Sequence, residues 1–211
     1  MRVAIHQPHY MPWLGYLRKM EEADVFVYLD NADYEKNGFQ NRNRILIDRR
    51  EHWLTVPVLT KGKLGQSIRG VKVNWDSTWN MKQYHTLLYN YPKEMKGKNG
   101  AMMSFFDWDG KLLVDWCVRS VDFLCHAYKI NTKRLFESDL KVSEVGTARL
   151  VNICRELGAD TYLSGPTGRD YMREEVFDDI EIEYMDWNPG THLSALHFYL
   201  REETEALRKE N

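Results

Sequence analysis

Short apolar runs alternate with amphipathic stretches along the chain. Residues 3–5 and 23–30 are apolar runs of the kind that forms strands, and residues 13–20 between them carry apolar residues at helical spacing. This order predicts a strand, a helix and a second, parallel strand, a unit that is right-handed in nearly all proteins. The nearly continuous apolar character of residues 23–30 is typical of a parallel strand that is covered on both faces.

The same pattern predicts the elements of the rest of the chain. Strands are expected at 45–47, 53–58, 68–73, 133–137, 161–163 and 181–185, and helices at 79–89, 111–128, 145–157 and 193–207, the last followed by a charged tail. The charged turn at 48–51 joins the first two of these strands into a β-hairpin. Residues 91–110 look least ordered by composition and predict a lid or an exposed loop.

Alternating strands and helices predict the α/β class. We expect a Rossmann-like fold with a mostly parallel central sheet, flanking helices and an insertion that contains the hairpin and further helices. A length of 211 residues suits a single α/β domain, 1–211, with the hairpin insertion at 45–75 and a helical part at 77–128.

Composition narrows the class of protein. A net charge of −2 argues against a broad nucleic-acid surface, although a local basic groove stays open. The three cysteines form no C-x-x-C pair and fall in apolar helical runs, which indicates free thiols in a reducing cytoplasm. No stretch approaches eighteen apolar residues and the N-terminus lacks a signal pattern, so we expect a cytoplasmic protein without a membrane span.

The turn after the first strand carries the most distinctive chemistry. In an α/β sheet, ligands bind where the carboxyl end of a strand opens into a loop and helix. His6, Gln7 and Tyr10 would lie at this edge, with Trp13 beside them, and Gly15 would let a ligand or a second backbone come close. The alternative is a stiff connector whose aromatic residues belong to the core. The density of polar and aromatic groups favours the functional interpretation.

Asp30 ends the second predicted strand on the same edge of the sheet as His6. A carboxylate there can bind a ribose, a metal or an amine, and it can equally cap a turn. The strand at 161–163 opens into Ser164, Gly165, Pro166, Thr167 and Gly168, and Tyr171 follows. Small residues expose backbone N–H groups that can hold an anion. This is the second point at which a strand ends in residues suited to ligand binding.

Asn41, Arg42, Asn43 and Arg44 alternate amide and guanidinium side chains. In an extended segment, alternate residues share a face, so the two arginines would point one way and the two asparagines the other. Two guanidinium groups on one face could clamp a phosphate or a carboxylate. The alternative is the solvated edge of a strand.

Four motifs together resemble the WbqC-like family, which occurs in bacterial O-antigen and other surface-polysaccharide gene clusters. They are His-Gln-Pro-x-Tyr-x-Pro-Trp-x-Gly at 6–15, Asn-Arg-Asn at 41–43, Trp-Leu-Thr-Val-Pro-Val at 53–58 and Tyr-Leu-Ser-Gly-Pro-x-Gly-x-x-Tyr at 162–171. The resemblance implies a transferase or ligase of surface-polysaccharide or related biosynthesis. Such an enzyme would move an amino-acyl group, for example glycyl, to a sugar or nucleotide acceptor.

The chain departs from the family pattern near its end. Where members read Leu-Ser-Ile-Leu-Asp-Leu-Leu-Phe, residues 193–200 read Leu-Ser-Ala-Leu-His-Phe-Tyr-Leu, so that His197 takes the aspartate position. This difference leaves the acceptor open, including a nucleotide or a nucleic acid. The start of the chain is also similar, at the level of the fold, to nucleotidyltransferases and ligases of the HIGH superfamily. That similarity adds ATP and Mg²⁺ as expected cofactors.

The expected roles follow from these patterns. We expect a catalytic set of His6, Asp30, Asn41 and Arg42, and a substrate- or nucleotide-binding set of Gln7, Tyr10, Trp13, Gly15, Asn43, Ser164, Gly165, Gly168 and Tyr171. His6 would neutralise charge that develops on a transferring group. Metal-dependent hydrolysis by His6, His9 and Asp30 is disfavoured, and we expect no protein-held metal, because His6 and His9 lack the i, i+4 helical spacing that places two ligands on one face. The alternative is a non-catalytic binding module for a sugar-nucleotide or a nucleic-acid-modification intermediate. A homodimer through the exposed hairpin edge is a further expectation.

Overall fold

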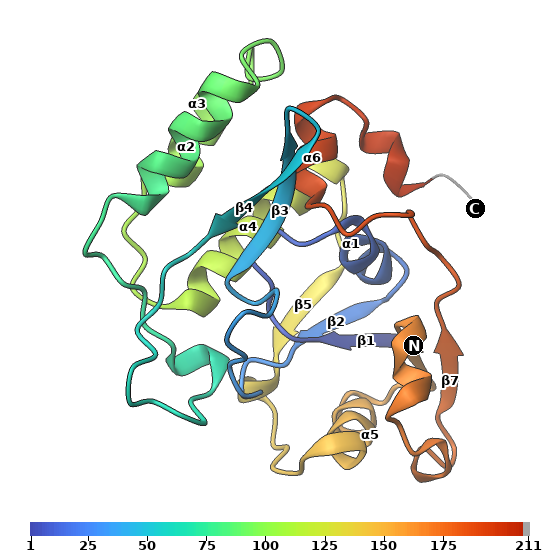
Figure 1. Cartoon of the computed structure of the whole chain (residues 1–211). Coiled ribbons are helices and arrows are strands. Elements are labelled where there is room, and N and C mark those ends of the chain that lie inside the picture. Colours follow the sequence, from blue (N-terminus) through green and yellow to red (C-terminus); the bar gives the residue numbers. More distant parts are fainter. Residues whose placement is uncertain (209–211) are drawn as a thin grey trace.

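Five parallel strands form the central sheet of the computed structural model, which describes residues 1–208 (Figure 1). In spatial order they are β5 (Lys133–Phe136), β2 (Val25–Tyr28), β1 (Arg2–His6), β6 (Thr161–Ser164) and β7 (Glu181–Tyr184). This order and the flanking helices confirm the predicted Rossmann-like α/β fold. The chain builds outward from β1 on one side and then returns to build outward on the other. The topological switch point therefore lies between β1 and β6.

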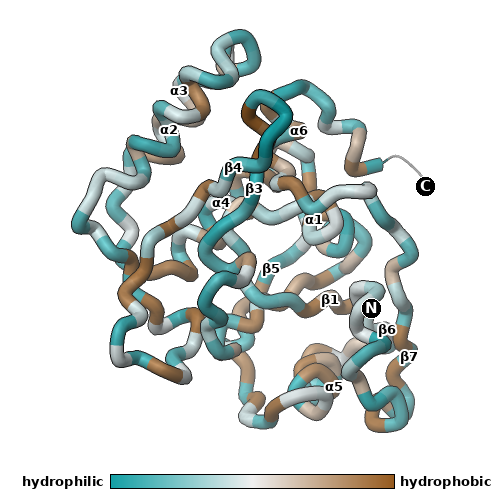
Figure 2. The backbone as a smooth tube through the Cα atoms, in the orientation of Figure 1, coloured by the Kyte–Doolittle hydropathy of each residue, from teal (hydrophilic) through white to brown (hydrophobic). Residues whose placement is uncertain are grey.

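Alternate residues of β1 pack into two separate cores. Val3 and Ile5 pack against α5 (Gly146–Leu157), whose buried face includes Leu150 and Ile153. Ala4 faces the larger core, which contains α1 (Leu14–Glu21), α4 (Leu113–Tyr128) and α6 (Ala195–Leu200). Figure 2 shows hydrophobic segments along β1 and α5. Strands that are buried on both faces give the continuous apolar runs seen in the sequence.

The insertion between β2 and β5 begins with the predicted hairpin. Strands β3 (Arg42–Ile47) and β4 (Arg50–Thr55) pair in antiparallel fashion, so the turn is shorter than the predicted 48–51 and the second strand ends at 55 instead of 58. Asp48 and Arg49 form the two-residue turn, both with positive φ (49° and 62°), which matches the twist of a tight hairpin. Helices α2 (Trp79–Asn90) and α3 (Asn99–Phe106) follow and lie side by side (Figure 1).

Three other predicted elements differ more strongly from the structure. Residues 68–73 hold the 3₁₀ turn η1 (Ile68–Gly70) instead of a strand, because the Ile68 and Arg69 N–H groups donate to the carbonyls of Ala32 and Asp30. Residues 91–110 are not simply a lid or an exposed loop, since they contain α3, in which Met102, Phe105 and Phe106 are buried in the core.

The predicted final helix is shorter than expected. Helix α6 ends at Leu200, Glu202 adopts a positive φ of 62°, and the 3₁₀ turn η5 (Thr204–Leu207) completes the described chain. Left-handed backbone at a non-glycine residue ends a helix. Most of the predicted charged tail, residues 209–211, lies outside the described residues. Three further 3₁₀ turns are η2 (Glu137–Asp139), η3 (Pro166–Asp170) and η4 (Glu174–Val176).

Candidate functional site

A cavity of about 190 Å³ lies at the switch point, at the carboxyl ends of β1 and β6. Five of the predicted site residues line it, namely His6, Gln7, Gly165, Gly168 and Tyr171. The loops after β1 and β6, which the sequence predicted separately as ligand-binding loops, thus lie together. Their pairing explains why, since Ala4 of β1 lies beside Leu163 of β6 in the parallel register. The loops that follow the two strands therefore border the same cavity.

The loop after β6 is packed tightly against the strand that precedes it. A Cβ on Gly168 would lie 2.1 Å from the Ser164 hydroxyl oxygen, so a larger residue there would force Ser164 to shift. The Ser164 hydroxyl donates to the Gly165 carbonyl at 3.0 Å, and the Gly168 N–H donates to the same carbonyl at 3.0 Å. The Gly168 N–H is therefore already engaged within the 3₁₀ turn, and the glycine's role here is close packing.

The His6 imidazole is neutral in the free protein. Burial lowers its pKa well below 6.5, and the neighbouring His9 and Lys19 lower it further. Its Nδ1 lies 3.0 Å from the Gln7 carbonyl oxygen, which can only accept, so Nδ1 carries the proton. Nε2 then keeps its lone pair. This state suits proton acceptance, and it differs from the charge-neutralising role expected from the sequence.

His9 extends the site outward from His6. The two imidazole rings meet edge to face at 4.6 Å, and burial lowers the His9 pKa to about 4. Gln7 is oriented by Gln40, whose buried side-chain amide donates to the Gln7 side-chain oxygen at 2.8 Å. The first loop thus presents its polar groups in fixed positions.

The sequence interpretation missed Lys19, which also lines the cavity. Its side chain is only 4% exposed, and Nζ donates to the Ile5 carbonyl at 2.8 Å. Burial lowers its pKa to about 7. No role for Lys19 was predicted from the sequence. The available signal was its spacing of three and four residues from Tyr16 and Gly15, which places it on the buried face of α1.

A series of rings and guanidinium groups continues from the cavity to the hairpin. The His9 ring lies 6.3 Å from Phe39, Phe39 lies 6.1 Å from Trp53, and Arg42 stacks over Trp53 at 4.2 Å. Arg44 stacks over the same indole at 5.3 Å, so the two arginines share a face as predicted. We call these residues, Phe39, Arg42, Arg44 and Trp53, the hairpin face. Arg44 pairs with Glu51, whereas Arg42 bonds the Asn37 carbonyl.

Three predicted site residues instead join the hairpin to the first loop and to α2. Tyr10 is fully buried and its hydroxyl donates to Gln83 at 2.8 Å. The Asn41 amide donates to the Val56 carbonyl at 2.8 Å, and the Asn43 amide donates to the Met11 carbonyl at 2.7 Å. These groups lie outside the cavity lining and hold the loop and the hairpin in place.

Trp13, Gly15 and Asp30 also lie outside the cavity lining. A Cβ on Gly15 would come within 2.2 Å of the Trp13 indole, so the glycine makes room for this ring rather than for a ligand. The Asp30 carboxylate is buried, accepts from the Ser138 N–H at 3.0 Å, and lies 3.9 Å from Arg69. It therefore connects the ends of β2 and β5.

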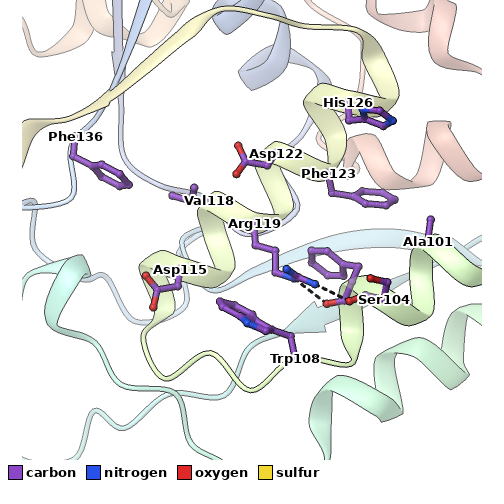
Figure 3. A pocket seen from close by; sticks show the side chains of 11 residues that line it. Ala101, Ser104, Trp108, Asp115, Val118, Arg119, Asp122, Phe123, His126 and Phe136 are labelled. Carbon is purple, nitrogen blue, oxygen red and sulfur yellow. Dashed lines mark hydrogen bonds between the residues drawn. The ribbon is translucent and has the colours of Figure 1, made fainter.

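A larger groove of about 640 Å³ runs along α4, between α3 and Phe136 of β5 (Figure 3). Arg119 covers the Trp108 ring at 4.9 Å and donates to the Phe105 and Ser104 carbonyls. Asp122 pairs with Arg134 at 3.1 Å. These contacts engage Arg119 and Asp122 with neighbouring protein groups, and the groove lies away from the carboxyl ends of β1 and β6.

The chain matches the WbqC-like protein family over residues 7–194. The chain belongs to this family. A family relative, the uncharacterized protein Rv1507c of Mycobacterium tuberculosis, is 30% identical over 189 residues, which cover 86% of this chain and 79% of the relative. No solved structure matches the chain.

The departure at His197 lies beyond the residues matched to the family. His197 is buried on α6, where its Nδ1 lies 3.2 Å from the Tyr91 hydroxyl. It is not among the residues that line the cavity. Within residues 1–208, no group of three or more His, Cys, Asp or Glu side chains could hold a metal ion. No helix in the same range is long and apolar enough to cross a bilayer.

Proposed function

We propose that this WbqC-like protein is a transferase or ligase of surface-polysaccharide or related biosynthesis. It moves an amino-acyl group, such as glycyl, to a sugar or nucleotide acceptor. The observation that carries the proposal is the cavity at the switch point, lined by the basic side chains His6 and Lys19 and, among its described lining residues, by no carboxylate. Such a lining suits an anionic reactant, and a neutral His6 suits removal of a proton from the attacking amine or hydroxyl.

The cavity is too small to hold a whole ligand of the proposed kind. Pockets for whole ligands are typically about 300–1,000 Å³, so a cavity of about 190 Å³ holds only the reacting group. The rest of the ligand would lie along the hairpin face. There Trp53 is 39% exposed and Phe39 is 36% exposed, and Arg42 can bind a phosphate.

Activation by ATP fits this arrangement. Joining a carboxylate to an amine or a hydroxyl is unfavourable in water, and ATP would supply the activation. The cavity lining offers basic groups to phosphate oxygens and no carboxylate to a cation. Mg²⁺ would therefore be held by the nucleotide phosphates and water, as it commonly is in such sites.

ATP–pyrophosphate exchange across a panel of amino acids, with magnesium present, tests the proposal. We expect exchange with one amino acid, and we expect His6→Ala to abolish it while circular dichroism stays unchanged. His85→Ala removes an exposed imidazole and is the matched control. Full exchange in a folded His6→Ala variant would overturn the role of His6. Absence of exchange with every amino acid would count against ATP and favour a pre-activated donor or simple binding.

A non-catalytic binding module is the second candidate. The hairpin face favours it, because exposed aromatic rings beside guanidinium groups suit a sugar-nucleotide or a modified nucleic-acid intermediate. Calorimetric binding of a sugar-nucleotide without turnover by the purified protein would support this candidate. Turnover by the protein alone would exclude it.

The cysteines bear on the location of the protein in the cell. All three cysteines are buried free thiols, which supports our proposal of a reducing, cytoplasmic location.

The β3–β4 hairpin forms a two-stranded sheet with an open edge, which supports the proposal of a homodimer. Size-exclusion chromatography with light scattering tests this proposal.

A further inference from the structure

Lys19 is a buried cation that lacks a carboxylate partner within residues 1–208. It is 4% exposed, and the one acceptor found for its Nζ is the Ile5 carbonyl at 2.8 Å. An ammonium group carries three donors, so two remain for other partners. A buried ammonium without a counter-charge is costly, which is why burial lowers the pKa of Lys19.

The groups around Lys19 supply no negative charge at neutral pH. From β1 it faces His6, which burial keeps neutral, and from β6 it faces Tyr162, whose ring centroid is 5.7 Å away. From α5 it faces Cys154, whose thiol pKa burial raises to about 12. Burial likewise raises the phenol pKa of Tyr162 and of Tyr171 on the loop after η3. A counter-charge for the ammonium form would therefore come from a ligand that enters the cavity.

We propose that the cavity binds an oxyanion, a phosphate or a carboxylate group, and that Lys19 is its charge partner. The proposal rests on the proposed function, since it assigns the anionic end of the donor to the end of the cavity beside α1. The Lys19 side chain lines the cavity together with His6 and Gly168, so an anion there can contact Nζ without any movement of the sheet.

Proton uptake is the distinctive consequence. In the free protein the Lys19 pKa is about 7, so at pH 8 most molecules carry a neutral amine. A bound anion favours the ammonium form and raises this pKa, so that binding at pH 8 takes up close to one proton. In the free protein His6 and His9 are neutral at pH 8 because their pKa values are lowered, and the Lys19→Met variant below separates uptake by Lys19 from uptake by His6.

The test is calorimetric titration at pH 8 in two buffers of different ionisation enthalpy. Sulfate is the first probe, because it does not titrate in this range and represents a phosphate group. Acetate represents a carboxylate. We expect uptake of close to one proton with at least one probe. Uptake with sulfate alone assigns the site to phosphate, and uptake with acetate alone assigns it to carboxylate.

Lys19→Met keeps an unbranched side chain and removes the charge. We expect at least tenfold weaker anion binding and no proton uptake, whereas Lys82→Met, the same change on the exposed surface of α2, leaves both unchanged. Equal affinity and equal uptake in Lys19→Met, or no binding of either probe to the native protein, would overturn the proposal. If Lys19→Met does not fold, the Lys19 pKa in the native protein, followed by NMR with and without sulfate, gives the same decision.

The two proposals fail separately. If the native protein takes up a proton with sulfate but shows no exchange activity, the oxyanion site is supported and the transferase function is rejected. If the Lys19→Met protein retains full exchange activity and normal sulfate binding, the proposed role of Lys19 is rejected and the transferase function is unaffected.

Discussion

The hydroxyl of Tyr10 donates a hydrogen bond of 2.8 Å to the side-chain oxygen of Gln83. This bond joins the first loop to α2, across 73 positions of sequence. The Gln83 amide in turn donates to the Thr55 carbonyl at the end of β4 at 2.7 Å. The loop that carries His6 is thus tied to the hairpin and to the helical insertion through one buried network.

Removal of the Tyr10 hydroxyl should weaken the fold. Tyr10→Phe leaves the buried Gln83 oxygen without its donor, so we expect a loss of about 1–3 kcal/mol in the free energy of unfolding by urea. Tyr89→Phe, which removes a hydroxyl from a side chain that is 78% exposed, is the control and should change little. Equal stability of Tyr10→Phe and the native protein would show that the bond contributes nothing.

A methyl group at Gly168 should disturb the site more than one at Gly165. The added Cβ of Gly168→Ala would meet the Ser164 hydroxyl, and we expect a loss of about 1–3 kcal/mol in unfolding experiments. Gly165→Ala meets no atom within 4 Å and has an ordinary φ of −70°, so its stability should hold or rise by about 0.4–1 kcal/mol. A reversed order of the two variants would contradict the packing described for this loop.

The fold should lose stability in mild acid, in part through His9. Its pKa is about 4 in the folded protein and 6.5 without burial, so between these values the unfolded chain binds a proton that the folded protein does not. The free energy of unfolding therefore falls as the pH drops through this window. His9→Gln should flatten the profile between pH 6.5 and 5, measured by urea unfolding, whereas His85→Gln should not. Parallel profiles for the two variants would argue against a lowered His9 pKa in the folded protein.

The hairpin face should contribute to affinity more than to stability. We expect Trp53→Ala to weaken ATP binding about five- to tenfold, in the lower part of the range for stacking on an aromatic side chain. Tyr89→Ala removes another exposed ring, far from Arg42 in sequence, and serves as the control. Isothermal titration calorimetry of both variants decides whether the ligand extends along this face. Unchanged affinity in Trp53→Ala would place the ligand elsewhere.

Local pattern was sufficient to predict the strands of the sheet and the two loops that meet at its switch point. Buried parallel strands leave continuous apolar runs, and each run that ends in polar or small residues marks a loop at the carboxyl edge. The hairpin and the shared face of Arg42 and Arg44 followed in the same way from alternation over a few residues.

The roles of single polar residues were not visible in the sequence, because their partners are far apart in the chain. Asn43 donates to Met11, 32 positions away, and Lys19 is buried only because α5 and β6 close over it. The break after α6 depends on one left-handed residue, Glu202, within a stretch that has helical spacing throughout. Each of these features depends on contacts between distant parts of the chain, so it cannot be predicted from a short stretch of sequence.

The most direct test of the site is an amide NMR titration of the native protein with ATP and magnesium. Binding at the switch point predicts the largest shifts at His6, Gln7, Lys19, Gly165 and Gly168, with smaller shifts at Arg42 and Trp53. Shifts confined to Ala101, Ser104 and Arg119 would place the ligand in the groove along α4 and contradict the assignment of the cavity.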